Sequence, residues 1–308
     1  MKNCKKIKLS LAIKTGICHI LSQEELKSLQ ELLLEMYKDV ASLCDKYGLE
    51  YMLAYGSCIG AVRHQGFIPW DDDLDIMMPM ASYEQLITLC DKGELGDKYE
   101  IGVPRRDKDN FITFLKIYRR GTTFIELTNI NTPFLKNICI DIFTMDFAPK
   151  NRIFRVLKGL ISNCMRFICT CVLYSQYPSE EERKLKSYSF ITKIRYKLAY
   201  TVGKIFGIIK HQKWIWWFDR FNFCTRNTGF MTISIGRRSY YKEVHPVECF
   251  LPTKKAIFEG IEVNIPSDAD IYLTAAYGDY MRIPPIEERE KHFIYKFDIG
   301  EKKEVQNE

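Results

Sequence analysis

The chain has 308 residues, of which 46% are hydrophobic and 27% are charged, a balance that excludes a disordered chain and allows one large core or two smaller ones. Its eleven cysteines include no C-x-x-C pair, which excludes a disulfide framework and favours a reducing cytoplasm. The formal net charge is +6, but residues 151–220 hold 14 Lys and Arg against 4 Asp and Glu, so one basic segment lies in a mildly acidic remainder.

The first 21 residues form a basic segment in which four lysines precede an apolar run. Lys14 and His19 interrupt that run and no small-x-small cleavage site follows, so we do not expect a secretory signal. No run of 18 uncharged apolar residues occurs, since Asn163 and Arg166 interrupt the nearest one, and a membrane-spanning helix is therefore not expected.

Hydrophobic periodicity predicts alternating helices and strands over the next part of the chain. Ser22 and Glu25 form a capping box at the start of an amphipathic helix that ends near Gly48. Apolar runs predict strands at 51–55 and 74–78, short helices at 59–64 and 82–90, and β-rich segments at 112–118, 122–127 and 138–143.

From residue 153 to residue 223 the pattern becomes helical, basic and aromatic, with Pro178 between two helices. Strands around a Glu259-Gly260 turn are expected at 256–265, and a helix at about 268–277 precedes Gly278. These changes divide the chain into a basic N-terminal segment (1–21), an α/β core (22–150), a basic aromatic helical region (151–226), a C-terminal α/β part (227–300) and a tail (301–308).

An acidic cluster carries the clearest chemical signal. Asp73 and Asp75 alternate with apolar residues, so on a strand both carboxylates face one side and repel each other unless a cation lies between them. Mg²⁺, or Mn²⁺ in its place, takes such oxygen ligands together with water and phosphate oxygens. Upstream, Gly56 would let the backbone approach a phosphate and Ser57 would offer a hydroxyl.

Asp141 supplies a third carboxylate in an otherwise apolar strand, where burial is costly unless the group is paired or bound to metal. Read alone, residues 69–73 are equally compatible with a solvated acidic loop. The order strand, Gly-Ser, helix, Asp-x-Asp, strand and later aspartate is the signature of the nucleotidyltransferase fold. We therefore expect an α/β fold with a mixed sheet flanked by helices and a mainly helical basic insertion.

The run from Tyr55 to Ile76 resembles the signature of the LicD family of phosphotransferases over more than twenty positions. The resemblance continues at Asp141-Ile142-Phe143, 258–260, 277–280 and 284–285, and thus covers most of the chain. Cys58 stands where a threonine or another small residue is usual. The family implies transfer of phosphocholine, or of ribitol or glycerol phosphate, from a CDP-activated donor to a glycan.

Carried over by position, the resemblance implies that Asp73, Asp75 and Asp141 are catalytic and hold Mg²⁺, with Asp71 as a further ligand. Asp72 would be an alternate ligand or would hold the ligands in place. Asp141 would orient or deprotonate the attacking hydroxyl. Arg63 would neutralise a donor phosphate. The candidate substrate- or phosphate-binding residues are Gly56, Ser57, Arg63, His64, Trp70, Lys116, Tyr277, Asp279 and His292. The pattern around Lys116 is equally compatible with an ordinary solvent-exposed lysine. The same holds for the Arg289-x-x-His292 pair, which is equally compatible with exposed polar side chains on a terminal helix.

The expected partners are CDP-choline or a CDP-polyol and a glycan or lipid-linked glycan of lipopolysaccharide, teichoic acid or capsule. Residues 151–226 have the composition of helices lying on an anionic membrane, and equally that of a helical subdomain packed on the core. No nucleic-acid motif is present. The family's bacterial roles favour a cytoplasmic protein, peripheral on the inner face of the cytoplasmic membrane.

Two other functions remain open at the level of sequence. A nucleotidyltransferase that adds NMP to a small molecule or protein would leave the nucleotide on its acceptor. A catalytically silent, membrane-bound scaffold would keep the fold without turnover, although such a scaffold gains nothing from the mutual repulsion of clustered acids.

Overall fold

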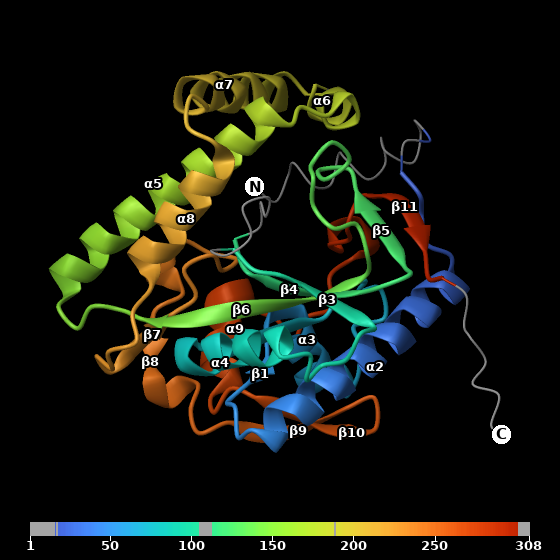
Figure 1. The fold of residues 1–308 in the computed structure, drawn as a ribbon, viewed down its shortest axis with the longest axis vertical. Coiled ribbons are helices and arrows are strands. Elements are labelled where there is room, and N and C mark those ends of the chain that lie inside the picture. The colour runs from blue at the N-terminus through green and yellow to red at the C-terminus, as the bar shows by residue number, and fades with distance from the viewer. Residues whose placement is uncertain (1–15, 17, 105–112, 188, 301–308) are drawn as a thin grey trace.

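A computed structural model describes residues 16, 18–104, 113–187 and 189–300. It confirms the expected mixed α/β fold, in which a curled sheet is flanked by helices and a group of helices projects to one side (Figure 1). The predicted tail, and all but a few residues of the predicted basic N-terminal segment, lie outside the described residues. The ten cysteines among the described residues are free thiols.

The central sheet has the strand order β1-β2-β6-β4-β3, and only its β2–β6 pair is parallel. Two short strands, β7 and β8, extend the far end of β6. These seven strands are β1 (Met52–Leu53), β2 (Asp75–Pro79), β3 (Tyr99–Gly102), β4 (Leu115–Arg119), β6 (Cys139–Phe147), β7 (Phe230–Thr232) and β8 (His245–Pro246). The parallel pair places the start of β2 beside β6, where the acidic residues of both strands meet.

Helix α2 (Gln23–Lys46) confirms the predicted capping box: Ser22 Oγ accepts from the Glu25 N–H, and Glu25 accepts from the Ser22 N–H. Its apolar side is buried, and α2 packs against β6 together with α4 (Met80–Asp91). Further along α2, the Gln30 amide donates to the Asp71 carbonyl over 2.9 Å. The first helix therefore also holds the acidic loop in place.

The predicted strand at 51–55 and short helix at 59–64 require correction. The strand ends at Leu53, and Tyr55, with φ 42°, begins helix α3 (Tyr55–Ile59). This helix continues into a π-helical turn, η1 (Gly60–His64), which Gln65 ends with φ 56°. Gly60 is required there, because a Cβ would lie 2.4 Å from the Gly66 carbonyl oxygen. Gly56 and Ser57 thus lie in a helical turn.

The other predicted segments of the first half are present with shifted ends, and β3 was not predicted. The predicted strand at 112–118 begins at Leu115, and Ile112 lies outside the described residues. The segment at 122–127 forms β5 (Thr123–Glu126), which pairs antiparallel with β11 (Ile294–Asp298). This pairing brings the end of the chain beside the core.

The basic aromatic region is helical, as predicted. It contains α5 (Arg152–Gln176), α6 (Glu180–Lys186), α7 (Phe190–Phe206) and α8 (His211–Asn222), with Pro178 between α5 and α6. Helix α5 packs against α7 and α8 and reaches η2 (Tyr240–Lys242) of the C-terminal part. By length and composition α5 could cross a membrane, and a third of its most apolar window is buried.

The C-terminal part wraps around the sheet. It contains the 3-10 turn η3 (Val247–Cys249), the hairpin of β9 (Lys254–Phe258) and β10 (Ile261–Ile265), α9 (Ala269–Tyr277) and the 3-10 turn η4 (Ile286–Glu288). The predicted Glu259-Gly260 turn is confirmed, since both residues have positive φ. Helix α9 packs against α3, and β9 packs against η1.

His211, at the start of α8, gives the helical region a pH-dependent stability. Burial lowers the pKa of its imidazole to about 4, whereas an unfolded histidine titrates near 6.5. Below pH 6.5 the unfolded chain therefore binds a proton that the folded chain excludes, and stability falls as the pH drops toward 4. We expect His211→Asn to remove up to about 3 kcal/mol of the difference in unfolding free energy between pH 7 and pH 4.5.

Urea unfolding at both pH values measures this difference. Gln212→Asn, at the next position of α8, removes no titratable group and is the matched control, so it should keep the pH dependence of the wild type. An unchanged pH dependence in His211→Asn would contradict the assignment.

Candidate active site

Three charged side chains form a row across the central sheet. Asp75 on β2 lies in register with Asp141 on β6, and Asp141 lies in register with Lys116 on β4, so all three point to the same face. Lys116 Nζ lies 2.5 Å from Asp141 Oδ1. Burial opposes the charged form of Lys116, but the Asp141 carboxylate raises the pKa of the ammonium well above its usual value. Lys116 therefore neutralises Asp141, and Asp75 has no such partner in the row.

The acidic loop before β2 is held close to α3. Gly56 makes this approach possible, because a Cβ there would lie 2.8 Å from Asp71 Oδ2. Ser57 is buried, and its Oγ accepts from the backbone N–H of Asp75 over 2.9 Å. Gly56 and Ser57 therefore position the acidic residues. The contacts with a phosphate that the sequence suggests for them remain a prediction.

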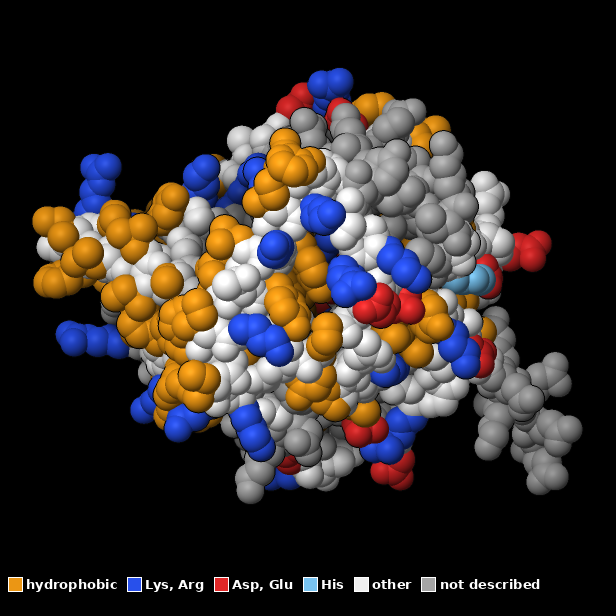
Figure 2. Space-filling view, turned by 90° about the horizontal axis from the view of Figure 1, so that it is seen from above, with side chains coloured by type: hydrophobic (Ala, Val, Ile, Leu, Met, Phe, Trp, Pro, Cys, Tyr) orange, Lys and Arg blue, Asp and Glu red, His pale blue; other side chains and the backbone are white. Residues whose placement is uncertain are grey.

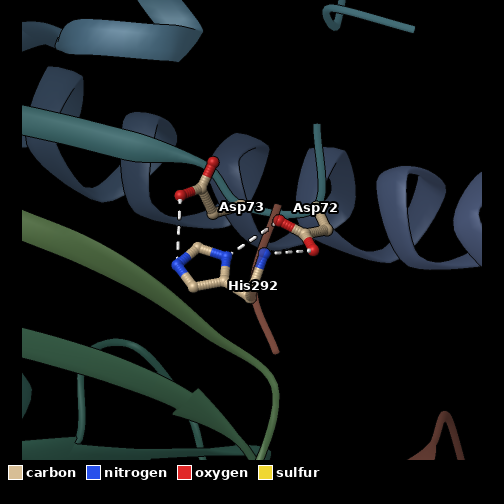
Figure 3. Close-up of side chains that lie close together, drawn as sticks. All are labelled: Asp72, Asp73 and His292. Carbon is tan, nitrogen blue, oxygen red and sulfur yellow. Dashed lines mark hydrogen bonds and ion pairs between the residues drawn. The ribbon is translucent and has the colours of Figure 1, made fainter. Parts of the chain in front are cut away.

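His292 binds the acidic loop from the C-terminal part of the chain (Figure 3). Its Nδ1 lies 2.8 Å from Asp72 Oδ1, its backbone N–H donates to Asp72 Oδ2 over 3.2 Å, and its Nε2 lies 3.9 Å from Asp73 Oδ2. Burial opposes protonation of the ring, but Asp72 raises the pKa of His292 well above its usual value. Burial conversely favours the neutral form of Asp72, but His292 lowers the pKa of that carboxyl. The two residues form an ion pair.

The remaining acids of the loop repel one another. Burial, followed by the charges of Asp73 and Asp72, raises the pKa of Asp71 well above its usual value. Burial is also the main cause that raises the pKa of Asp73 to about 6, although His292 opposes it. Asp75 is raised well above its usual value by burial and by Asp73 and Asp141. Asp75 is buried and Asp71 and Asp73 are half-buried. Three neighbouring carboxylates with this preference for the neutral form require protons or a cation.

The donor set fits a divalent metal ion. Carboxylate oxygens are the ligands that Mg²⁺ and Mn²⁺ prefer, and a dication would relieve the repulsion that raises these pKa values. Among the described residues, one group of three brings ligand atoms within 4.8 Å of one another, namely Asp72, Asp73 and His292. Asp75 and Asp141 neighbour this group through the sheet, but their ligand atoms do not join it at that distance.

A cavity of about 420 Å³ opens beside the acidic residues. The core contributes Tyr55, Gly56, Asp71, Asp72, Asp73, Asp75 and Phe143, and the β5 segment contributes Glu126, Leu127 and Thr128. The helical region contributes Glu182 and Lys186, and the C-terminal part contributes Ile235, Arg237, Tyr277, Glu290, Lys291, His292 and Phe293. Of the predicted binding residues, Gly56, Tyr277 and His292 therefore line the cavity.

The other predicted binding residues have structural partners away from the cavity lining. Arg63 donates to the Tyr280 and Arg282 carbonyls and to His64 Nε2. These bonds join η1 to the C-terminal segment.

Trp70 packs under the Arg289 guanidinium, which lies 3.9 Å from its ring centroid, and Asp279 accepts from the Arg282 N–H. Arg289 and His292 lie in the extended segment after η4, not on a terminal helix.

Arg237 is a cavity residue that the sequence did not indicate. Its guanidinium forms two bonds to the Glu290 carboxylate, of 2.5 and 2.9 Å, and lies 4.4 Å from the centre of the Tyr277 ring. Glu182 and Lys186 were missed as well, because they belong to a helix remote in sequence from the acidic loop. Nothing in the local pattern around these residues distinguishes them from ordinary surface charges, so only tertiary contact identifies them.

Strands β2 and β6 are parallel, and aspartates lie just before β2, at its start and within β6. This arrangement defines a nucleotidyltransferase-type domain, and comparison with known proteins agrees. Residues 48–155 match the family described as LicD/FKTN/FKRP, nucleotidyltransferase domain. The chain thus carries a nucleotidyltransferase domain, and that domain is of the LicD family. The match includes Asp71, Asp73, Asp75, Lys116 and Asp141.

Curated relatives extend the likeness beyond the domain. The chain is 25% identical over 257 residues to the lipopolysaccharide cholinephosphotransferase LicD of Haemophilus influenzae, which covers 82% of this chain and 90% of that protein. It is 33% identical over 99 residues to an uncharacterized protein of Rickettsia prowazekii, which covers 26% of this chain and 36% of that protein. Because it covers 82% of the chain, the likeness to the Haemophilus influenzae protein includes most of the helical region and of the C-terminal part.

The Ser57 hydroxyl is expected to fix the start of β2. In Ser57→Ala the buried N–H of Asp75 loses its acceptor, which should lower the unfolding free energy by about 1–3 kcal/mol and speed amide exchange in β2. Ser82 gives a matched control, because its Oγ accepts from the Glu50 N–H over 3.0 Å away from the acidic loop.

Chemical denaturation and hydrogen exchange followed by mass spectrometry measure both effects. Ser82→Ala should lose stability without faster exchange in the peptide that contains β2. Equal exchange of that peptide in Ser57→Ala and the wild type would contradict the role given to Ser57.

Proposed function

We propose that this protein is a phosphotransferase that moves phosphocholine from CDP-choline to a hydroxyl of a surface glycan such as lipopolysaccharide and releases CMP. The observation that carries the proposal is the cluster of mutually repelling carboxylates of Asp71, Asp73 and Asp75 beside a cavity in a LicD-family domain. The name of the Haemophilus influenzae relative, a lipopolysaccharide cholinephosphotransferase, supports the choice of donor and acceptor.

Asp73 and Asp75 are the proposed ligands of Mg²⁺, or of Mn²⁺, with Asp71 as a further ligand. When bound, the dication would neutralise charge on the donor diphosphate and on the CMP leaving group. His292 keeps Asp72 ionised and fixes the orientation of the loop, so Asp73 is presented toward the cavity.

Arg237 is the proposed phosphate-binding group of the C-terminal part. Its planar guanidinium already makes a bidentate contact to a carboxylate, Glu290, and a phosphate presents the same geometry. Lys291 adds positive charge to the lining, where Lys186 is paired with Glu182. A donor diphosphate would therefore lie between the acidic loop and these cations.

Asp141 remains the proposed residue that orients the attacking hydroxyl. Lys116 compensates the charge of Asp141. Asp141 lies next to Asp75 in the row across the sheet, and thus beside the proposed metal ligands. A carboxylate held in this way can accept a hydrogen bond from a sugar hydroxyl.

The cavity lining favours choline over a polyol as the transferred alcohol. Four aromatic residues, Tyr55, Phe143, Tyr277 and Phe293, line it. Aromatic faces attract a quaternary ammonium. The carboxylates of the lining would accept hydrogen bonds from the hydroxyls of ribitol or glycerol phosphate as well, so the aromatic residues are the reason to rank choline first. Ribitol and glycerol phosphate are thus the second choice of donor group.

Asp73→Asn should abolish transfer while the fold persists. Loss of one proposed metal ligand removes several kcal/mol of transition-state stabilisation, so CMP release should fall by roughly a thousandfold. The assay follows CMP release from CDP-choline, CDP-ribitol and CDP-glycerol with Mg²⁺ and acceptor lipopolysaccharide, and Asp97→Asn, on the surface, is the control expected to keep full activity.

The products separate the proposal from its alternatives. Choline phosphate on the acceptor with free CMP supports it, whereas a nucleotide on the acceptor indicates NMP transfer. No product from any donor, in a folded protein, favours a silent scaffold. Full activity of Asp73→Asn would remove the argument for the acidic cluster.

Divalent metal should stabilise the folded chain, because a bound dication relieves the repulsion among Asp71, Asp73 and Asp75. With Mg²⁺ or Mn²⁺ at 100 times its Kd, we expect a gain of about 2.7 kcal/mol, seen as a higher Tm, which EDTA reverses. In Asp75→Asn the starting Tm should rise, since one buried charge is gone, and the increase caused by metal should shrink. An equal metal-induced increase in Asp75→Asn would show that the ion binds elsewhere.

A further inference from the structure

Over residues 152–167, helix α5 presents its polar side to the protein and its apolar side to the outside. Lys158 donates to the Asn222 carbonyl over 3.1 Å, and Asn163 accepts from the Tyr240 N–H over 3.1 Å. Arg166 donates to the Gly236 and Arg238 carbonyls over 2.8 and 3.2 Å. Residues 158, 159, 162, 163 and 166 recur at helical spacing, so one face of α5 is bonded to the rest of the chain.

Over residues 153–167 the opposite face of α5 is apolar and exposed, whereas further along Ile168, Cys171 and Val172 are buried. The exposed apolar residues are Ile153, Phe154, Leu157, Leu160, Ile161 and Phe167. Helix α7, which packs against α5, adds Phe190, Ile191, Ile194, Leu198 and Ile205, and Ile208 follows it. We call these residues the apolar helical face. In an aqueous protein such a stripe is normally turned inward, so its exposure indicates an apolar surrounding for this part of the molecule.

Positive charge surrounds the apolar helical face. The exposed basic residues of these helices and their connections are Arg152, Arg183, Lys184, Lys193, Arg195, Lys197, Lys204, Lys210 and Lys213. Of the three acids of α6, Glu180 is exposed and Glu182 is buried. Figure 2, seen from above α7, shows orange hydrophobic and blue basic groups over the left part of this view, without red carboxylates there.

We propose that α5 and α7 lie flat on an anionic phospholipid membrane, with the apolar helical face among the acyl chains and the surrounding lysines and arginines at the head groups. Amphipathic helices bind membranes in this way through apolar burial and attraction to anionic lipids. The inference does not depend on the proposed reaction, since it rests on the outer surface of the helices.

The contacts of α5 distinguish this arrangement from a crossing helix. Although α5 is long and apolar enough to cross, Lys158 and Arg166 bond the backbone of Asn222, Gly236 and Arg238. A crossing would carry these charged groups and their irregular backbone partners into the hydrocarbon, where polar groups are costly. A helix that lies in the interface keeps every one of these bonds.

Charge also decides against a second copy of the chain as the occupant. Residues 151–220 carry 14 Lys and Arg against 4 Asp and Glu, so two such faces would repel each other. An anionic lipid surface complements this charge. The choice also suits the cavity, because α6, between α5 and α7, contributes Glu182 and Lys186 to its lining. A membrane-bound protein would thus hold the cavity near lipid-linked glycans.

Flotation of the full chain with vesicles tests the proposal. We expect binding to phosphatidylglycerol-containing vesicles at low salt, weaker binding to pure phosphatidylcholine, and release by high salt or alkaline carbonate. Ile161→Glu, at a residue that is 49% exposed, should weaken binding by roughly tenfold or more, because it removes apolar burial and adds a like charge. Ile257→Glu on β9, at 48% exposure, is the matched control and should bind like the wild type.

A second variant tests the charges. Replacing Lys193, Arg195 and Lys197 by Gln should weaken binding by about fivefold per residue on anionic vesicles and little on neutral ones. The proposal is overturned if the wild type does not float with anionic vesicles, or if Ile161→Glu floats as well as Ile257→Glu. Resistance to carbonate would indicate a crossing helix, and a dimer in solution that Ile161→Glu dissociates, without vesicle binding, would identify a second copy as the occupant.

Discussion

The repulsion among the carboxylates at the start of β2 and in the loop before it is the constraint on which the rest of the site depends. Asp71, Asp73 and Asp75 lie close together under conditions that raise the pKa of each. Neighbouring residues compensate this cost in different ways: Gln30 holds the loop backbone, Ser57 holds the strand, Lys116 neutralises Asp141, and His292 neutralises Asp72. An unfavourable arrangement of charges that several neighbouring residues compensate is typical of a functional site, where reactive groups are placed at a cost in folding stability.

The cavity is completed by parts of the chain that are far apart in sequence. The β5–β11 pairing brings the last strand to the core and sets His292 beside the loop, while α6 reaches the cavity from the helical region. The added parts bring basic residues, Arg237, Lys186 and Lys291, together with the acids Glu182 and Glu290, whereas the core brings the aspartates. The proposed binding of a donor diphosphate with a metal ion would therefore use both the LicD-family domain at 48–155 and the chain that follows it.

Local patterns predicted the features that depend on neighbouring residues, namely the capping box of α2 and the Glu259-Gly260 turn. The expected shared strand face of Asp73 and Asp75 is wrong, because β2 begins at Asp75 and Asp73 lies in the loop before it. The features that were missed depend on distant contacts. Tyr55 adopts a positive φ that no pattern indicates for a tyrosine, which shortened the predicted strand. Arg237 and the His292–Asp72 ion pair reach the site from parts of the chain that are far away in sequence. The polar side of α5 faces inward because its residues bond distant parts of the chain, as Lys158 bonds Asn222.

Anomalous diffraction from crystals grown with Mn²⁺ and CDP tests the central claim most directly, since Mn²⁺ takes the same oxygen ligands as Mg²⁺ and can be located by its scattering. The account predicts an ion bound by carboxylate oxygens of Asp73 and Asp75, next to the bound CDP. An ion absent from the cavity, or one held without Asp73 and Asp75, would contradict it.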